Sequence, residues 1–85
     1  MISTTPKLQV VIKSRKKELY NSFASSVTSI NSTGVFDVLP QHANFITLVK
    51  DYITVDEGLP TKQFFKLDRG VIRVKDDVVT AYLGI

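Results

Sequence analysis

The segment "GVIRVKDDVVTAYLGI" at residues 70–85 decides the fold class, because its apolar and polar side chains alternate. A β-strand places successive side chains on opposite faces, so each arm of this segment predicts a strand with one apolar and one mixed face. A turn at residues 75–77 would join the two arms into a hairpin. The side chains that we expect in the core are Ile72, Val74, Val79, Ala81 and Leu83.

The rest of the chain repeats this pattern in short apolar segments separated by turn-type residues. Val, Ile and Thr recur throughout, and β-branched side chains favour strands over helices. Closely spaced short strands are typical of an antiparallel sandwich or barrel. The segments that we expect as further strands are 8–12, 18–22, 24–30, 35–39, 45–49, 52–55 and 63–67.

Composition limits the class of protein further. The chain has 85 residues, of which 44% are hydrophobic and 22% charged, so residues 1–85 should form a single globular domain. It contains no cysteine, which excludes disulfides, thiolate metal sites and cysteine nucleophiles. No apolar run is long enough to span a membrane, and the first charges follow an apolar segment, the reverse of a secretory signal. We therefore expect a soluble intracellular protein without direct membrane insertion.

The net charge of +3 comes partly from the basic cluster "KSRKK" at residues 13–17. Lys and Arg neutralise phosphate charges, so one interpretation is a nucleic-acid-binding patch. The other is a solvated turn between two strands, where lysine keeps an edge from pairing with another chain. The cluster lacks the aromatic side chains that stack on bases, which favours the turn.

The sequence offers little for catalysis. Its only imidazole is His42, in "GVFDVLPQHANFITL" at residues 34–48. A nucleophilic triad needs a base, a zinc site needs several ligands, and no serine lies in a G-x-S-x-G turn. The adjacent carboxylates at 56–57 and 76–77 fall in predicted turns, where we expect them to be solvated. Pro40 ends a strand, and we interpret His42 as a buried side chain that pins the following turn by hydrogen bonds.

The segment 34–48 also resembles a known family, the N-terminal domain of the epsilon subunit of F-type ATP synthases, which corresponds to the mitochondrial delta subunit. The family carries Gly-x-x-Gly-x-Leu-Pro-x-His-Ala-Pro, which is matched here by Gly34, Leu39, Pro40, His42 and Ala43. Its Ser-Gly-Gly-Phe-x-x-Val hairpin is similar to residues 67–85, with matches at Gly70, Val74, Asp77, Val79 and Thr80. Asp37 replaces the second glycine of the first motif, and Asn44 replaces its last proline.

The resemblance implies a β-sandwich of about ten short strands, in agreement with the alternation. It also implies a rotor subunit of the central stalk that binds the gamma subunit and the polar loops of the c-ring, and helps couple ion translocation to ATP synthesis. Such a subunit is peripheral at the cytoplasmic face of the inner membrane, is not an enzyme, and takes no cofactor, metal, small-molecule substrate or nucleic acid. Longer members continue into a helical hairpin that can inhibit rotation and bind ATP. A chain that ends at Ile85 should therefore lack the C-terminal helical hairpin and both properties.

By the same resemblance, the loop that contains the histidine motif faces the c-ring. The candidate ring contacts are Thr33, Gly34, Val35, Gln41 and His42. On the outer face of the last hairpin, Val71, Arg73 and Tyr82 are candidate gamma contacts, because exposed aromatic and arginine side chains often anchor interfaces. The alternative function is a free-standing β-barrel module that binds nucleic acid or peptide through the basic cluster, and a small hydrolase is a third, more remote one.

Overall fold

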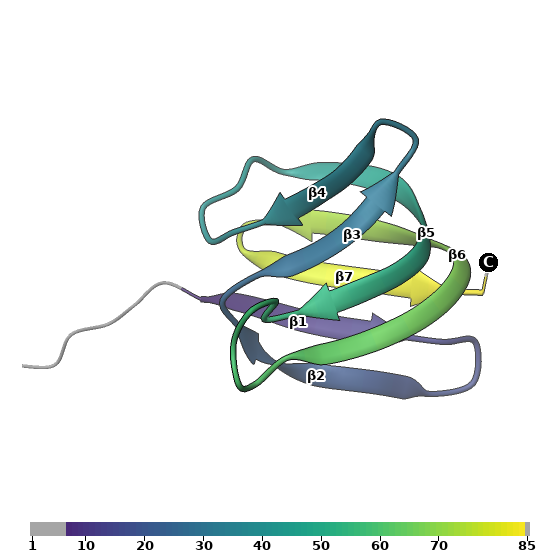
Figure 1. Cartoon of the computed structure of the whole chain (residues 1–85), viewed down its shortest axis with the longest axis horizontal. Coiled ribbons are helices and arrows are strands. Elements are labelled where there is room, and N and C mark those ends of the chain that lie inside the picture. The colour runs from purple at the N-terminus through teal and green to yellow at the C-terminus, as the bar shows by residue number, and fades with distance from the viewer. Residues whose placement is uncertain (1–6, 85) are drawn as a thin grey trace, which may run out of the picture.

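A computed structural model describes residues 7–84, and all of the regular structure there is β-strand (Figure 1). The strands are β1 (Leu8–Lys13), β2 (Glu18–Ala24), β3 (Val27–Asn31), β4 (Gly34–Val38), β5 (Phe45–Val55), β6 (Gln63–Lys75) and β7 (Val78–Leu83). They form one seven-stranded sheet in the order β2-β1-β7-β6-β5-β3-β4. The predicted all-β class is confirmed. No helix that could cross a membrane occurs between residues 7 and 84.

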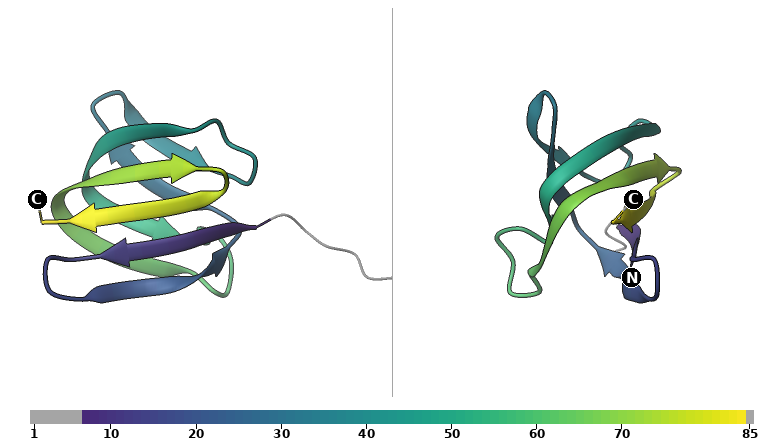
Figure 2. Two further views of the ribbon diagram at one scale, coloured as in Figure 1. Left: turned by 180° about the vertical axis from the view of Figure 1, so that it is seen from behind. Right: turned by 90° about the vertical axis from the view of Figure 1, so that its right-hand side faces the viewer.

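The sheet folds over on itself because the two longest strands, β5 and β6, bend together. Residues 45–50 of β5 pair with residues 69–74 of β6, and residues 51–55 pair with residues 63–67. The paired segments 45–50 and 69–74 continue into β7, β1 and β2, and together these strands form what we call the β1 layer. The paired segments 51–55 and 63–67 continue into β3 and β4 and form the β3 layer. Figure 2 shows the two layers facing each other.

The structure differs from the predicted antiparallel sandwich of about ten short strands in two details, the number of strands and their pairing. Segments 45–49 and 52–55 belong to one strand, and so do segment 63–67 and the first arm of the last hairpin, because the β5–β6 ladder continues through the bend. The pairing is also not antiparallel throughout, since β1 runs parallel to β7.

Residues that a regular strand disfavours build the bend. Asp51 has a φ of 70°, and the β5–β6 register passes over Asp68. The buried hydroxyl of Ser29 donates a hydrogen bond to the carbonyl of Tyr52 at 2.6 Å, where the β3–β5 register also shifts. Such bulges bend a ladder without ending it, provided that the displaced backbone groups find partners.

Gly70 lies just after the bend, where β6 and β7 approach each other closely. A Cβ atom at this position would lie 2.5 Å from the carbonyl oxygen of Tyr82 and 3.3 Å from a methyl group of Leu83. Only glycine therefore fits without moving the β7 backbone.

The core lies between the two layers. Ile72, Val74, Val79, Ala81 and Leu83 are all buried, as the alternation predicted. The turn of this hairpin is the pair Asp76–Asp77, with φ values of 50° and 64°. Positive φ at both central residues is the geometry of a type I′ turn, whose twist matches that of the flanking strands.

The sandwich has two open sides, one along each edge strand of the sheet, β2 and β4. An aromatic pair covers each of them. Tyr20 of β2 meets Phe65 of the β3 layer edge to face, with ring centroids 5.9 Å apart. Phe36 of β4 meets Phe45 of the β1 layer in the same way at 6.0 Å. Such pairs contribute about 0.5–1.5 kcal/mol beyond the area that they bury, and here they also cover the core at the two open sides.

Candidate partner-binding surfaces

The turn between β3 and β4 projects from the sandwich (Figures 1 and 2). Asn31 Oδ1 accepts hydrogen bonds from the backbone N–H of Thr33 at 2.9 Å and from its hydroxyl at 2.7 Å, so the turn is held by its own side chains. Gly34 has a φ of 123°, which other residues rarely adopt. Val35 follows with 63% of its surface exposed. The tip is therefore ordered, and presents hydroxyls beside one exposed apolar side chain.

The turn between β4 and β5 contains His42, whose predicted burial is wrong, although its ring does form a hydrogen bond with a backbone group of this turn. His42 is exposed. Its backbone N–H donates to the carbonyl of Leu39 at 3.1 Å, and its Nδ1 lies 2.7 Å from the carbonyl oxygen of Ala43, to which the Nδ1–H tautomer would donate. The imidazole also packs against the ring of Phe45, with centroids 4.9 Å apart. These contacts are local, because the proline-containing turn directs the side chain outward.

Other residues fasten this turn to the body of the domain. Asp77 Oδ1 accepts a hydrogen bond from the backbone N–H of Gln41 at 2.6 Å. Asn44 Oδ1 accepts one from the backbone N–H of Asp76 at 2.9 Å. Gln9 of β1 in turn donates its backbone N–H to the carbonyl of Asp77 at 2.9 Å. Sequence reasoning placed Asp76 and Asp77 in a turn but expected solvated carboxylates, so it missed this contact between two turns that are distant in sequence.

The candidate ring contacts do not form one loop. Thr33, Gly34 and Val35 lie where β4 begins, whereas Gln41 and His42 follow its end (Figure 1). A strand advances about 3.3 Å per residue, so the two groups are separated by more than about 13 Å along β4. A single partner could touch both groups only by lying along the free edge of β4, the last strand of the sheet.

The candidate gamma contacts share one face, the outer face of the β1 layer. Val71 and Tyr82 are directly paired across β6 and β7, and Arg73 lies two residues from Val71 on the same side of β6. The register adds Leu48 opposite Val71 and Ile46 opposite Arg73. Ile46 and Leu48 are 68% and 71% exposed, which is high for large aliphatic side chains.

This apolar surface extends across the layer to β2. Val11 of β1 pairs with Thr80, and Val78 pairs with Gln9, which in turn pairs with the exposed Phe23 of β2. We call it the apolar face and define it by Val11, Phe23, Ile46, Leu48, Val71, Val78 and Tyr82. The alternation in "NFITLV" could have identified Ile46 and Leu48 as outward-facing side chains. Phe23 had no comparable signal, because β2 has few buried side chains on either side.

Asp56 is the main ionisable residue that sequence reasoning misjudged. It is 6% exposed, with Oδ1 accepting from the backbone N–H of Ser25 at 2.6 Å and Oδ2 accepting from the hydroxyl of Thr61 at 2.7 Å. Burial alone would raise the pKa of Asp56, but hydrogen bonds from Thr61, Ser25 and Ser26 together with the charge of Lys7 lower this pKa below its usual value. Both carboxylate oxygens of Asp56 accept a hydrogen bond, each from a different loop, which indicates a structural role.

The described residues contain no group of His, Asp and Glu side chains placed to hold a metal ion. Within residues 7–84, every buried side-chain nitrogen or oxygen has a hydrogen-bond partner. The features that remain to be explained are therefore surfaces: the apolar face, the projecting β3–β4 turn and the basic cluster at residues 13–17, which we call the basic turn.

Two solved structures show the same fold. A chain in the cryo-EM structure of the Euglena gracilis mitochondrial ATP synthase, with OSCP, F1 and c-ring in rotational state 1, superposes with a TM-score of 0.82 at 15% identity over 95% of this chain. A chain in the cryo-EM structure of the Tetrahymena thermophila mitochondrial ATP synthase central stalk and c-ring gives 0.77 at 12% identity over 98%. The chain spans 52% of the first and 67% of the second. Among curated proteins, none matches it.

The family comparison covers almost the whole domain. Residues 7–82 match the model of the family described as ATP synthase, Delta/Epsilon chain, beta-sandwich domain. The match takes in all of the strands except the last residue of β7, together with the resembling segment 34–48 and residues 67–82 of the second one. The chain therefore belongs to the family of ATP synthase delta/epsilon chain β-sandwich domains.

Proposed function

We propose that the domain is a central-stalk subunit of a rotary ATP synthase, which binds the gamma subunit through the apolar face and the c-ring through the β3–β4 turn. The observation that carries this proposal is the apolar face itself, in a chain that belongs to the delta/epsilon family. A globular domain rarely leaves several large apolar side chains exposed on one face unless a partner covers them.

The composition of the apolar face suits a protein interface. Aliphatic side chains from β5 and β6 lie beside Tyr82, and Arg73 lies among them, between Ile46 and Thr80. Two lysines flank the face at its ends, Lys13 opposite Tyr82 and Lys75 opposite Val78. Interfaces are enriched in aromatic and arginine anchors and depleted of charge at their centre. These side chains come from strands that are already paired on both sides, so docking would order few additional backbone groups.

The β3–β4 turn is the better candidate for the ring, because it projects and is internally ordered, whereas the β4–β5 turn is tied back onto Asp76 and Asp77. Gln41 and His42 would then contact the ring only if the free edge of β4 lies along it. Cysteine cross-linking to the ring loops from Thr33 and, separately, from Gln41 distinguishes the two arrangements.

In this proposal, the domain is not catalytic and needs no cofactor, metal or substrate. It would sit as a peripheral component at an energy-coupling membrane and act as a rigid wedge between gamma and the ring, which helps couple ion translocation to ATP synthesis. Close-packed interiors transmit strain with little compression, and a sandwich with aromatic pairs on both open sides is suited to that task.

The test is co-purification of the full chain with its gamma subunit. We expect a complex that survives moderate salt, because apolar contacts are not screened. Leu48→Asp should weaken it more than tenfold, as for a side chain in the interface centre. Phe64→Asp is the matched control, because Phe64 is 60% exposed but lies on the outer face of the β3 layer.

Equal effects of the two substitutions would contradict this placement of the gamma surface. If gamma does not retain the unmodified chain, and the chain instead binds DNA or RNA tightly, the stalk function is wrong and the nucleic-acid-binding module replaces it.

A further inference from the structure

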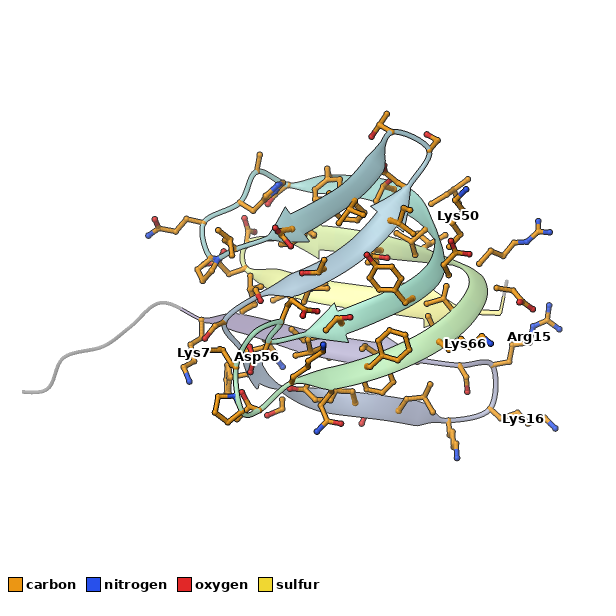
Figure 3. The ribbon with its side chains drawn as sticks, viewed as in Figure 1. Lys7, Arg15, Lys16, Lys50, Asp56 and Lys66 are labelled. Atoms are coloured by element: carbon orange, nitrogen blue, oxygen red, sulfur yellow. The ribbon has the colours of Figure 1, made fainter. Side chains whose placement is uncertain are left out.

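The basic turn at residues 13–17 belongs to a larger group of cations at one end of the sandwich. Figure 3 shows Arg15, Lys16, Lys50 and Lys66 at this end, opposite Lys7 and Asp56. Arg69 belongs to the group as well, because it pairs with Lys50 across β5 and β6, and its carbonyl accepts the N–H of Gly84 at 3.1 Å. We call this group the cationic end and define it by Lys13, Arg15, Lys16, Lys17, Lys50, Lys66 and Arg69.

The cations of the cationic end form no salt bridge within residues 7–84. The one salt bridge among residues 7–84 joins Lys62 to Glu57, away from this end. Asp51 and Asp68 lie at the nearby bend and Glu18 starts β2, but none of them comes within ion-pair distance of a cation; the Glu18 carboxylate accepts a hydrogen bond from Asn21 instead. All seven cationic side chains are exposed, so they are available to an external anion.

The arrangement fits a broad anionic surface better than a small anion. The cations come from the β1–β2 turn, from β5 and from β6, and only Arg15 is held in place, by donating its Nε–H to the carbonyl of Gly84 at 3.0 Å. A site for a single phosphate would use converging, buried donors, and no cation here is buried. Long, exposed cationic side chains that come from several elements suit a surface whose anionic groups can rearrange around them.

The position of the cationic end points to a membrane. Lys50 and Arg69 line a shallow hollow together with the carboxylate-bearing Asp68, with Asn31 at the end of β3 and with Ser32 of the β3–β4 turn. If that turn meets the c-ring, as in the proposed function, these cations lie beside the membrane surface that surrounds the ring. We propose that the cationic end binds the phosphate headgroups of anionic lipids, and so holds the domain against the bilayer next to the ring. A nucleic acid fits less well, because the basic turn offers no aromatic side chain for stacking, and the rings beside Lys66, those of Tyr52 and Phe64, stack on each other.

The test measures co-sedimentation of the full chain with vesicles, and needs neither gamma nor ring, so its failure is distinct from failure of the proposed function. Vesicles of phosphatidylcholine are compared with vesicles that contain phosphatidylglycerol. We expect binding only to the latter at about 0.1 M salt, and release at about 1 M salt, where the screening length falls to about 3 Å. Each lysine near an anionic surface contributes a factor of about five in partitioning. The double variant Lys16→Gln with Lys50→Gln should therefore bind about 25-fold more weakly.

The matched control is Lys62→Gln with Lys75→Gln, which removes the same charge from exposed positions at the other end of the domain. It should change binding far less, and thermal unfolding checks that both variants fold. Three outcomes would overturn the proposal: no binding to phosphatidylglycerol vesicles at low salt, equal weakening by the two double variants, or tighter binding to single-stranded RNA than to the vesicles. Displacement by inorganic phosphate beyond that caused by sodium chloride of equal ionic strength would overturn it too, because it would indicate a discrete anion site.

Discussion

The buried carboxylate of Asp56 allows a sharp test of how the loops of this domain are held together. Asp56, which is labelled in Figure 3, directly follows β5. It joins two loops, because its carboxylate accepts hydrogen bonds from the Ser25 N–H of the β2–β3 connection and from the Thr61 hydroxyl of the β5–β6 loop. Its own N–H donates to the carbonyl of Ser26 at 3.0 Å. Removal of its charge should loosen both loops at once.

The magnitude follows from these contacts. A hydrogen bond to a charged group contributes about 1.5–3 kcal/mol, and part of this offsets the cost of burying the carboxylate. Asp56→Asn retains an acceptor and tolerates the positive φ of this residue, but it removes the charge, so we expect a loss of about 1.5–3 kcal/mol in the free energy of unfolding. Thr61→Val removes only one donor and should cost about 1 kcal/mol.

The pH dependence gives a second, independent signature. The pKa of Asp56 is lower in the folded state than its ordinary value of 3.8. The folded state therefore favours the ionised carboxylate, and this contribution is fully present above the ordinary value and is lost as the pH falls through the lowered folded pKa. The stability difference between the unmodified protein and Asp56→Asn should accordingly shrink in acid.

The assay is urea denaturation of the unmodified protein, both single variants and the double variant, from neutral pH to about pH 2. The double-mutant cycle should show a coupling between Asp56 and Thr61 of about 0.5–1.5 kcal/mol at neutral pH. If Asp56→Asn is as stable as the unmodified protein at neutral pH, or if its deficit persists unchanged at low pH, the assigned role of this carboxylate is incorrect.

Three further substitutions probe the core, the bend and the histidine. Gly70→Ala should destabilise the domain by about 1–3 kcal/mol, because the added Cβ meets the Tyr82 carbonyl, and chemical denaturation that shows no loss would contradict the close approach of β6 and β7. Leu83→Ala should cost about 2–5 kcal/mol by leaving a cavity, and a thermal midpoint close to that of the unmodified protein would mean that the register of β7 is shifted. His42→Ala should cost no more than about 1 kcal/mol, since it removes one exposed hydrogen bond and a ring contact; a larger loss of stability would restore the pinning role.

The sequence predicted the part of the core that the last hairpin supplies, but little of the closure. Alternation identified the buried side chains of the last hairpin, because a register shift of one residue would have exposed all of them to solvent. The bend was hidden, since Asp51 and Asp68 look like strand breakers in isolation and only pairing with a bent partner makes them bulges. Asp56 was hidden for a similar reason: its partners, Ser25 and Thr61, lie on loops whose proximity depends on the fold.

The candidate surfaces show the same division between local and non-local information. Val71, Arg73 and Tyr82 could be placed on an outer face from the sequence, because each lies in a regular hairpin. That Leu48 continues this face follows only from the β5–β6 register. The separation of Thr33 from His42, by contrast, already followed from the expected strand at residues 35–39, which lies between them, although the resemblance treated the two groups as one loop.

The shared strands β5 and β6 also determine how force would pass through the domain. Where two sheets share no strand, side-chain contacts alone resist the sliding of one sheet over the other. Here two continuous strands, β5 and β6, cross from one layer to the other. In the proposed assembly, gamma would hold the β1 layer and the ring would act on the β3–β4 turn. A shearing load between them would therefore be carried along covalent backbone and through the hydrogen bonds of the β5–β6 ladder. The sandwich would turn as one body, and its side-chain packing would not be the first element to yield.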